Sequence, residues 1–227
     1  MSKVLLGVCA AVLCAATGTA LASPVTIDFS GVVQSVDAGF GSSVANGATV
    51  SGSFTYDPAA VATSGDAMGA QFGALMGITF HIGATYVNLL GPNSILTSHS
   101  GADVFQVLAD TRVDSSTHVT GGTLNGLSAN DFVLNDHAPF GALFSDARHL
   151  PTSLSGVSSV DSALSFIQLG FIDPKTGAED FVMASLTSLT PEGAHSVPEP
   201  ASLALMAIGL GALLLRRPRS LFAAQLA

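Results

Sequence analysis

The sequence predicts an all-β protein, an antiparallel β-sandwich of jelly-roll type, with an apolar helical segment at each end. Three observations support this fold class. Short runs alternate between apolar and polar residues, as strands with one buried face do. Gly, Asn and Asp stand between the runs, and these residues favour tight turns. No central stretch combines the length and spacing of a long amphipathic helix, so helices are expected only at the two ends.

Residues 1–22 are predicted to form a helical secretory signal peptide. A single lysine precedes the apolar stretch 4–16, and the small residues Ala20 and Ala22 stand just before Ser23. A basic start, an apolar helix and an A-x-A site together form the signal that signal peptidase cleaves. Both cysteines of the chain lie in this segment. Cleavage before Ser23 would therefore leave no thiol for a disulfide, a metal site or a nucleophile.

Residues 23–189 are expected to form one β-sandwich domain, which is large enough to build its own core. The segment 67–76 has a weak helical spacing, but Gly69 and Gly73 each cost a helix about 1 kcal/mol relative to Ala. Strands are predicted for the remaining periodic runs, which are 25–29, 50–56, 80–82, 86–90, 104–109, 119–124, 131–134, 164–172 and 181–189.

Turn signals separate these runs. Asn-Gly pairs occur at 46–47 and 125–126, and Asp-Pro-Lys-Thr-Gly occupies 173–177. The last of these predicts a hairpin between the final two strands. The Ser-rich stretch 151–162 is expected to be a surface loop, and 190–196 a polar linker to the C-terminal segment.

The charge of the central region is strongly acidic. Between Ser23 and Val197 there are fifteen Asp or Glu residues and only three basic residues, Arg112, Arg148 and Lys175. Nucleic-acid binding requires clustered Lys and Arg to displace counterions. A nucleic-acid partner is therefore excluded.

The central region lacks the local motifs of common enzymes. It contains no G-x-S-x-G nucleophile elbow, no P-loop and no G-x-G-x-x-G fingerprint in a strand-to-helix setting. Six histidines are scattered without a close pair. We therefore expect no catalytic residues, no cofactor and no enzymatic activity.

Two acidic stretches are weak candidates for other chemistry. Asp173, Glu179 and Asp180 offer the oxygen atoms that calcium prefers, but the residue order of a calcium loop is missing. A hairpin turn with solvated carboxylates explains them equally, and no metal site is predicted. The run 130–137 holds acids suited to acid–base work or to calcium, and a strand flanked by turn residues explains it as well.

The C-terminal segment 197–220 has three parts in order. It begins with Val197-Pro198-Glu199-Pro200, in which the prolines restrict the backbone to an extended form. An uncharged apolar helix is predicted for 201–215, about 22 Å long and therefore a marginal membrane span. The basic cluster Arg216, Arg217 and Arg219 follows and should stay cytoplasmic. The residues 221–227 form a short additional tail.

These three parts resemble the PEP-CTERM sorting signal of exported proteins in exopolysaccharide-producing Gram-negative bacteria. The resemblance implies recognition by an exosortase, a membrane protease that cuts near the Pro-Glu-Pro motif. The runs 25–31 and 50–57 also resemble the first strands of many PEP-CTERM passenger domains. The residues 221–227 extend past the point where such tails commonly end.

The sequence thus predicts an exported cell-surface or matrix protein without enzymatic activity. Its precursor is expected in the inner membrane, and its mature form in the envelope, at the surface or in the matrix with exopolysaccharide. One alternative is a calcium- or glycan-binding module. A second alternative is a secreted polysaccharide hydrolase, since fifteen acids offer many pairs of carboxylates.

Overall fold

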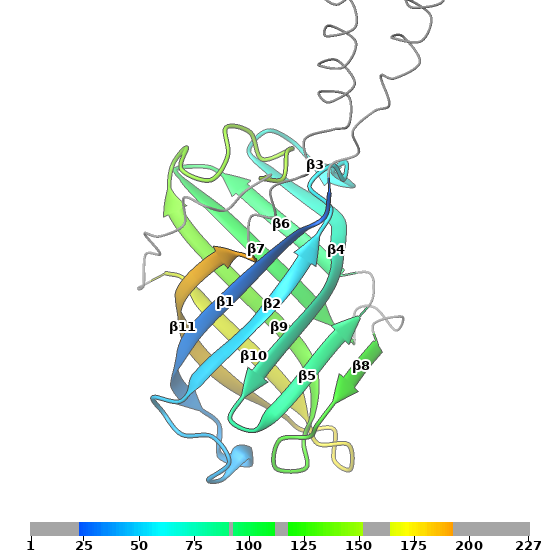
Figure 1. The fold of residues 1–227 in the computed structure, drawn as a ribbon, viewed down its shortest axis with the longest axis vertical. Coiled ribbons are helices and arrows are strands. Elements are labelled where there is room, and N and C mark those ends of the chain that lie inside the picture. Colours follow the sequence, from blue (N-terminus) through cyan, green and yellow to red (C-terminus); the bar gives the residue numbers. More distant parts are fainter. Residues whose placement is uncertain (1–22, 91–92, 112–117, 152–163, 193–227) are drawn as a thin grey trace, which may run out of the picture. The chain divides into compact units, whose positions relative to one another are not determined.

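The computed structural model describes residues 23–90, 93–111, 118–151 and 164–192, which form one antiparallel sheet (Figure 1). A single-turn helix, η1 (Ala38–Phe40), follows the first strand. The strands are β1 (Val25–Val36), β2 (Thr49–Tyr56), β3 (Ser64–Gly65), β4 (Gly69–Ile82), β5 (Thr85–Leu90), β6 (Asn93–His99), β7 (Ala102–Asp110), β8 (His118–Gly121), β9 (Ser128–Pro139), β10 (Phe166–Ile172) and β11 (Glu179–Pro191).

The sheet closes on itself. β1 pairs with β2 on one edge and with β11 on the other. From β11 the order continues through β10, β9, β7, β6 and β4, and β4 pairs with β2. We call this closed set of strands the ring. Figure 1 shows β1, β2 and β4 side by side across its near face.

β4 makes the closure possible because it has two partners along each edge. Its second half pairs with β2 on one edge and with β5 on the other. Its first half pairs with β3 and with β6. β5 in turn pairs with β8, which lies off the ring. The strand is therefore shared between the ring and the β5–β8 extension.

Aromatic side chains fill the interior of the ring. Phe29 on β1 contacts Phe132 on β9, with ring centroids 5.5 Å apart, and Phe54 on β2 contacts Phe105 on β7 at 6.1 Å. All four are at most 2% exposed. Near η1, Phe40 packs edge-on against Phe171 of β10 at 5.3 Å. These contacts join strands that are distant in the sheet order, so the core extends across the ring.

The antiparallel all-β prediction is confirmed, with one continuous closed sheet rather than two separate sheets. The segment 67–76, in which Gly69 and Gly73 oppose a helix, is not helical, because residues 69–76 form the first part of β4. β6 was not predicted, since its inward positions include the polar residues Asn93, Thr97 and His99, which hide the alternation. The hairpin of β10 and β11 around 173–177 is confirmed.

The boundaries differ at several places. β8 ends at Gly121, short of the predicted 124, whereas β9 extends well beyond 131–134 on both sides. β11 continues through Pro191, two residues into the predicted linker 190–196. The predicted loop 151–162 lies, apart from its first residue, outside the described residues.

The two terminal helices predicted for 1–22 and 201–215 also lie outside the described residues. Within the described ranges, no helix has both the length and the apolar character of a membrane span.

Candidate functional site

Buried polar side chains gather at one end of the ring, where β6 and β9 end and β7 and β10 begin. Asp103, Asp136 and Ser165 are at most 2% exposed, and His99 is 9% exposed. Residues 140–151, which we call the capping loop, follow β9 at this end. The loop contributes buried apolar side chains of its own, from Phe144, Ala147 and Leu150.

His99 and Asp103 form the closest polar pair of this cluster. They are opposite each other across the tight connection between β6 and β7, in which Gly101 has a φ of 75° that favours glycine. The Nδ1 atom of His99 lies 2.6 Å from Oδ1 of Asp103. The imidazole also stacks on Phe140, with ring centroids 4.0 Å apart.

Asp103 connects this pair to the capping loop. Its Oδ2 atom accepts hydrogen bonds from the backbone N–H of Leu143 at 2.8 Å and of Phe144 at 3.3 Å. Burial raises the pKa of Asp103. However, hydrogen bonds from Leu143, His99, Gly141 and Phe144 outweigh burial and hold the pKa below its ordinary value. The carboxylate is therefore ionised under ordinary conditions and fastens the loop.

Two further hydroxyl groups fasten the same loop. Thr97 Oγ1 donates to the carbonyl oxygen of Ala147 at 2.6 Å, and Tyr56 Oη donates to that of Pro151 at 2.6 Å. Burial raises the pKa of the Tyr56 phenol above its ordinary value. The phenol therefore stays neutral and acts as a hydrogen-bond donor.

Asp136 is the buried acid of this cluster that has the fewest hydrogen bonds. Its side chain is fully buried on β9, where Ser165 Oγ donates to Oδ1 at 3.4 Å. Its Oδ2 atom has no hydrogen-bond partner among the described residues. Burial raises the pKa of Asp136 to about 6, and the Ser165 hydrogen bond and the nearby His137 oppose this only in part.

An Asp–His pair can orient a general base, but here its contacts are with the capping loop. The His99 ring centroid is 4.0 Å from that of Phe140 and 6.0 Å from that of Phe144. Among the described residues, no hydroxyl forms a hydrogen bond with His99. The arrangement thus holds the loop over the end of the ring.

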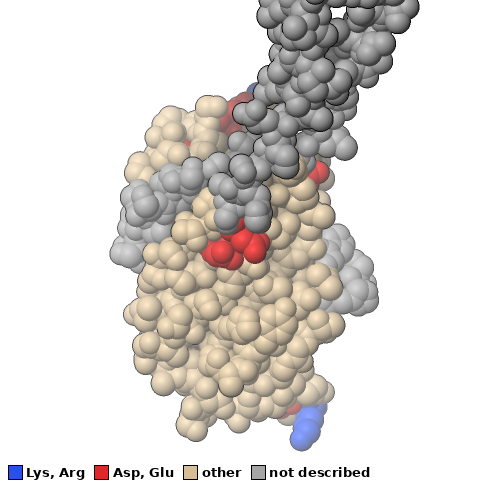
Figure 2. Space-filling model, in the orientation of Figure 1, with Lys and Arg blue, Asp and Glu red and all other residues tan. Residues whose placement is uncertain are grey.

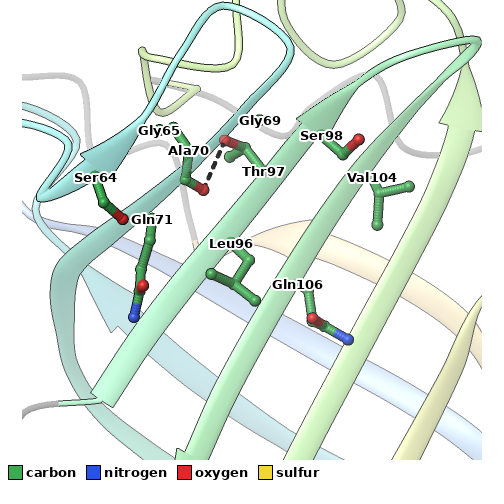
Figure 3. A pocket seen from close by; sticks show the side chains of 10 residues that line it. All are labelled: Ser64, Gly65, Gly69, Ala70, Gln71, Leu96, Thr97, Ser98, Val104 and Gln106. Carbon is green, nitrogen blue, oxygen red and sulfur yellow. Dashed lines mark hydrogen bonds between the residues drawn. The ribbon is translucent and has the colours of Figure 1, made fainter.

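A separate, shallow hollow of about 420 Å³ lies on the outer face of β4, β6 and β7 (Figure 3). Gln71 on β4 is opposite Leu96 on β6, which is opposite Gln106 on β7. Figure 3 shows the two amides on either side of Leu96. No charged residue is among the lining residues, which are Ser64, Gly65, Gly69, Ala70, Gln71, Leu96, Thr97, Ser98, Val104 and Gln106.

The face of the ring that is drawn in Figure 2 has few charges. Figure 2 shows a face that is mostly uncharged, with a compact acidic area near its centre, smaller acidic spots toward its edges and a basic group at its lower edge. A second shallow hollow, on β2, β4 and β5, is likewise lined without charge, by Ser53, Thr55, Met76, Gly77, Thr79, Asn88 and Leu90. The outer face of the sheet is thus suited to polar, uncharged contacts.

The three weak metal candidates do not converge. Asp173 accepts hydrogen bonds within its own turn, from Lys175 N and Thr176 Oγ1, both at 2.8 Å. Asp180 accepts from Gly39 N at 3.2 Å. Glu179 accepts from Asn130 Nδ2 at 2.9 Å. In the part of the chain that the structure describes, no group of three or more His, Cys, Asp or Glu residues could hold a metal ion.

The run 130–137 divides between the two faces of β9. Asp136 points into the buried cluster, whereas Asp131 accepts a hydrogen bond from Gln168 Nε2 of β10 at 3.1 Å. The sequence reasoning missed the His99–Asp103 pair. The available signal was a His and an Asp four residues apart around Ser-Gly, a spacing that places them opposite each other in a tight hairpin.

Of the predicted sorting residues, the structure describes only Ser23. Ser23 is exposed, two residues before β1. Ala20 and Ala22 of the predicted cleavage site lie outside the described residues, as do the motif Val197, Pro198, Glu199 and Pro200 and the basic cluster Arg216, Arg217 and Arg219.

Comparison with known proteins identifies the C-terminal segment. A family model described as the PEP-CTERM protein-sorting motif matches residues 196–219. No curated protein and no solved structure matches the chain. The match coincides with the segment in which the sequence predicts a Pro-Glu-Pro turn, an apolar helix and an arginine cluster. The motif implies a secreted protein that is directed to an exosortase. This chain therefore carries a PEP-CTERM protein-sorting motif at residues 196–219.

Proposed function

We propose that this chain is an exported, non-enzymatic protein of the cell envelope, the cell surface or the extracellular matrix. The observation that carries the proposal is the sorting motif at residues 196–219. In this proposal signal peptidase cleaves before Ser23, the apolar C-terminal segment holds the precursor in the inner membrane, and an exosortase then processes it. We call the described part of residues 23–192 the β unit. It is the part that reaches the destination, where it associates with exopolysaccharide.

Three features of the β unit favour a structural or binding role over catalysis. Both carboxylate oxygens of the buried Asp103 are hydrogen-bonded, one to His99 and the other to the backbone of the capping loop. Asp136 is fully buried, and a general acid must reach its substrate. The two hollows on the outer face are lined by hydroxyl, amide and apolar groups. Such linings suit adhesion to an uncharged surface.

The test of this proposal is a single substitution in the sorting motif, Glu199→Gln, with Glu192→Gln as its matched control. Both remove one carboxylate, and Glu192 is exposed and precedes the motif. In cells that contain an exosortase, we expect Glu199→Gln to accumulate as uncut precursor in the membrane fraction, whereas Glu192→Gln is processed like the wild type. Fractionation followed by immunoblotting measures both. Equal processing of the two variants would contradict exosortase-dependent sorting through Glu199.

A further inference from the structure

We infer that the hollow on the outer face of β4, β6 and β7 is a binding site for a neutral polysaccharide chain. The site consists of a row of side chains that crosses neighbouring strands. Gln71, Leu96 and Gln106 occupy β4, β6 and β7, and Asn135 follows opposite Gln106 on β9. At the usual spacing of neighbouring strands, about 4.8 Å, this row extends over about 14 Å. It is long enough to contact more than one sugar unit.

The amides of this row have hydrogen-bonding capacity to spare. Gln71 Nε2 donates to Ser94 Oγ at 3.0 Å, which fixes the side chain and leaves its carbonyl oxygen as an acceptor. Asn135 Nδ2 donates to the carbonyl oxygen of Leu164 at 3.1 Å, with the same consequence. The side-chain amide of Gln106 forms no hydrogen bond with any described residue, whereas its backbone belongs to the sheet. Primary amides both donate and accept, as sugar hydroxyls do, so the two sets of groups are complementary.

The centre of the row is apolar. Leu96 lies between Gln71 and Gln106 in the register, and Val104 also lines the hollow. A sugar ring presents C–H groups on its faces and hydroxyls around its edge. An apolar floor between two amides therefore matches both parts of a sugar unit, whereas a purely polar or purely apolar groove would match only one.

Charge selects a neutral polymer. The lining contains no ionisable residue. Among the described residues, the only Lys and Arg are Lys175 and Arg148, and Arg148 is already paired with Asp146 at 2.6 Å. A site without cations on an acidic protein repels carboxylated or phosphorylated chains. We therefore expect discrimination between neutral and anionic polysaccharides.

β4 offers a matched pair of positions for testing the site. Gly69 lines the hollow, and a Cβ atom there would meet only the carbonyl oxygen of Thr97, at an ordinary 3.6 Å. Gly73 lies on the same strand outside the lining, and a Cβ atom there would meet nothing within 4 Å. Neither glycine has a positive φ. Gly69→Val therefore fills the hollow, and Gly73→Val adds the same side chain elsewhere on the strand without loss of fold.

The experiment is affinity electrophoresis of the full chain in native gels that contain hydroxyethylcellulose, dextran or laminarin, with alginate as the anionic comparison. We expect retardation by at least one neutral polymer and none by alginate. The apparent dissociation constant should rise at least tenfold in Gly69→Val and in Gln106→Ala, and should be unchanged in Gly73→Val. Circular dichroism of each variant establishes that the fold is kept.

Several results would overturn the inference. They are no retardation by any of the three neutral polymers, equal retardation by alginate, or equal binding by wild type, Gly69→Val and Gln106→Ala. This inference rests on the proposed function, because the site would be where the β unit attaches to the polysaccharide. Release of new reducing ends from the same polymers would contradict the non-enzymatic function and would leave the binding site in place, so the two failures are distinguishable.

Discussion

Asp136 is a buried carboxyl group with few hydrogen-bond donors around it. Its one described hydrogen-bond donor is Ser165, at 3.4 Å, and its Oδ2 atom lacks a partner among the described residues. A buried carboxylate in such a site is costly, whereas the protonated form is tolerated. The raised pKa of about 6 is the expected result, and it couples the stability of the β unit to pH.

Asp136→Asn should change this coupling. The folded-state pKa lies above the unfolded value of about 3.9, so the folded protein binds more protons, and the contribution of Asp136 to stability falls as the pH rises from about 4 to about 6. Relative to wild type, the variant should therefore gain about 2 kcal/mol in free energy of unfolding between pH 4 and pH 7. Urea denaturation at both pH values measures the difference.

The matched control is Asp28→Asn, which removes an exposed carboxylate of β1. The pH dependence of its difference from wild type shows what removal of an exposed carboxylate does by itself, and the gain of Asp136→Asn should clearly exceed it. Asp103, whose pKa is lowered, contributes stability that is lost as the pH falls. Wild type, Asp136→Asn and Asp28→Asn all contain Asp103, so its contribution cancels in the differences between them. A pH-independent difference between Asp136→Asn and wild type would show that Asp136 has an ordinary pKa.

Among individual residues, the sequence predicted the sorting motif but not the buried polar cluster. Val197 to Pro200 and the three arginines form a contiguous signal, so they are readable without a fold. The cluster is different, because Ser165 reaches Asp136 only when β9 and β10 pair. Asp136 also looked like one more acid in a polar run. Nothing in its local sequence marks it as buried.

The closure between β2 and β4 is the feature of the strands that most constrains the fold. Gly52 of β2 lies opposite Phe80 of β4. A Cβ atom at this position would collide with the carbonyl oxygen of Thr79 and would lie 2.7 Å from Cζ of Phe29. Only glycine therefore lets β2 approach β4 while Phe29 packs beneath it.

Gly52→Ala should accordingly destabilise the protein by about 1–3 kcal/mol, as overpacking of a tight contact does. Gly73→Ala on β4 is the matched control, because its Cβ atom would meet nothing within 4 Å. That variant should be unchanged or more stable by about 0.5 kcal/mol, since alanine restricts the unfolded chain. Thermal unfolding of both variants gives the comparison. Similar stability of Gly52→Ala and Gly73→Ala would contradict the close approach of β2 to β4.

Alternation and turn residues predicted most strands and the last hairpin, because both signals are local. β6 was not predicted because polar residues occupy its inward positions. Thr97 there bonds the capping loop, and His99 bonds Asp103. The first half of β4 has small residues and two glycines, which weaken any periodicity. Closure of the sheet depends on long-range pairing between strands, and local patterns carry no information about it.

The first and last strands of the β unit pair with each other. β1 pairs with β11 along most of its length, with Ile27 opposite Pro191, and Glu192 N donates to the carbonyl oxygen of Thr26 at 2.9 Å. The ring therefore cannot close until the last strand is available. Residue 192 is followed after only three residues by the matched motif, which begins at 196. The folded unit and the sorting signal are thus close neighbours along the chain.

Intact-mass spectrometry of the protein recovered from the envelope and extracellular fractions tests the proposed export and processing at both ends. We expect a mature protein that begins at Ser23 and ends near the Pro-Glu-Pro motif, within or next to residues 197–200. Recovery of the chain with residues 201–227 still attached in those fractions, or with residues 1–22 uncleaved, would contradict it.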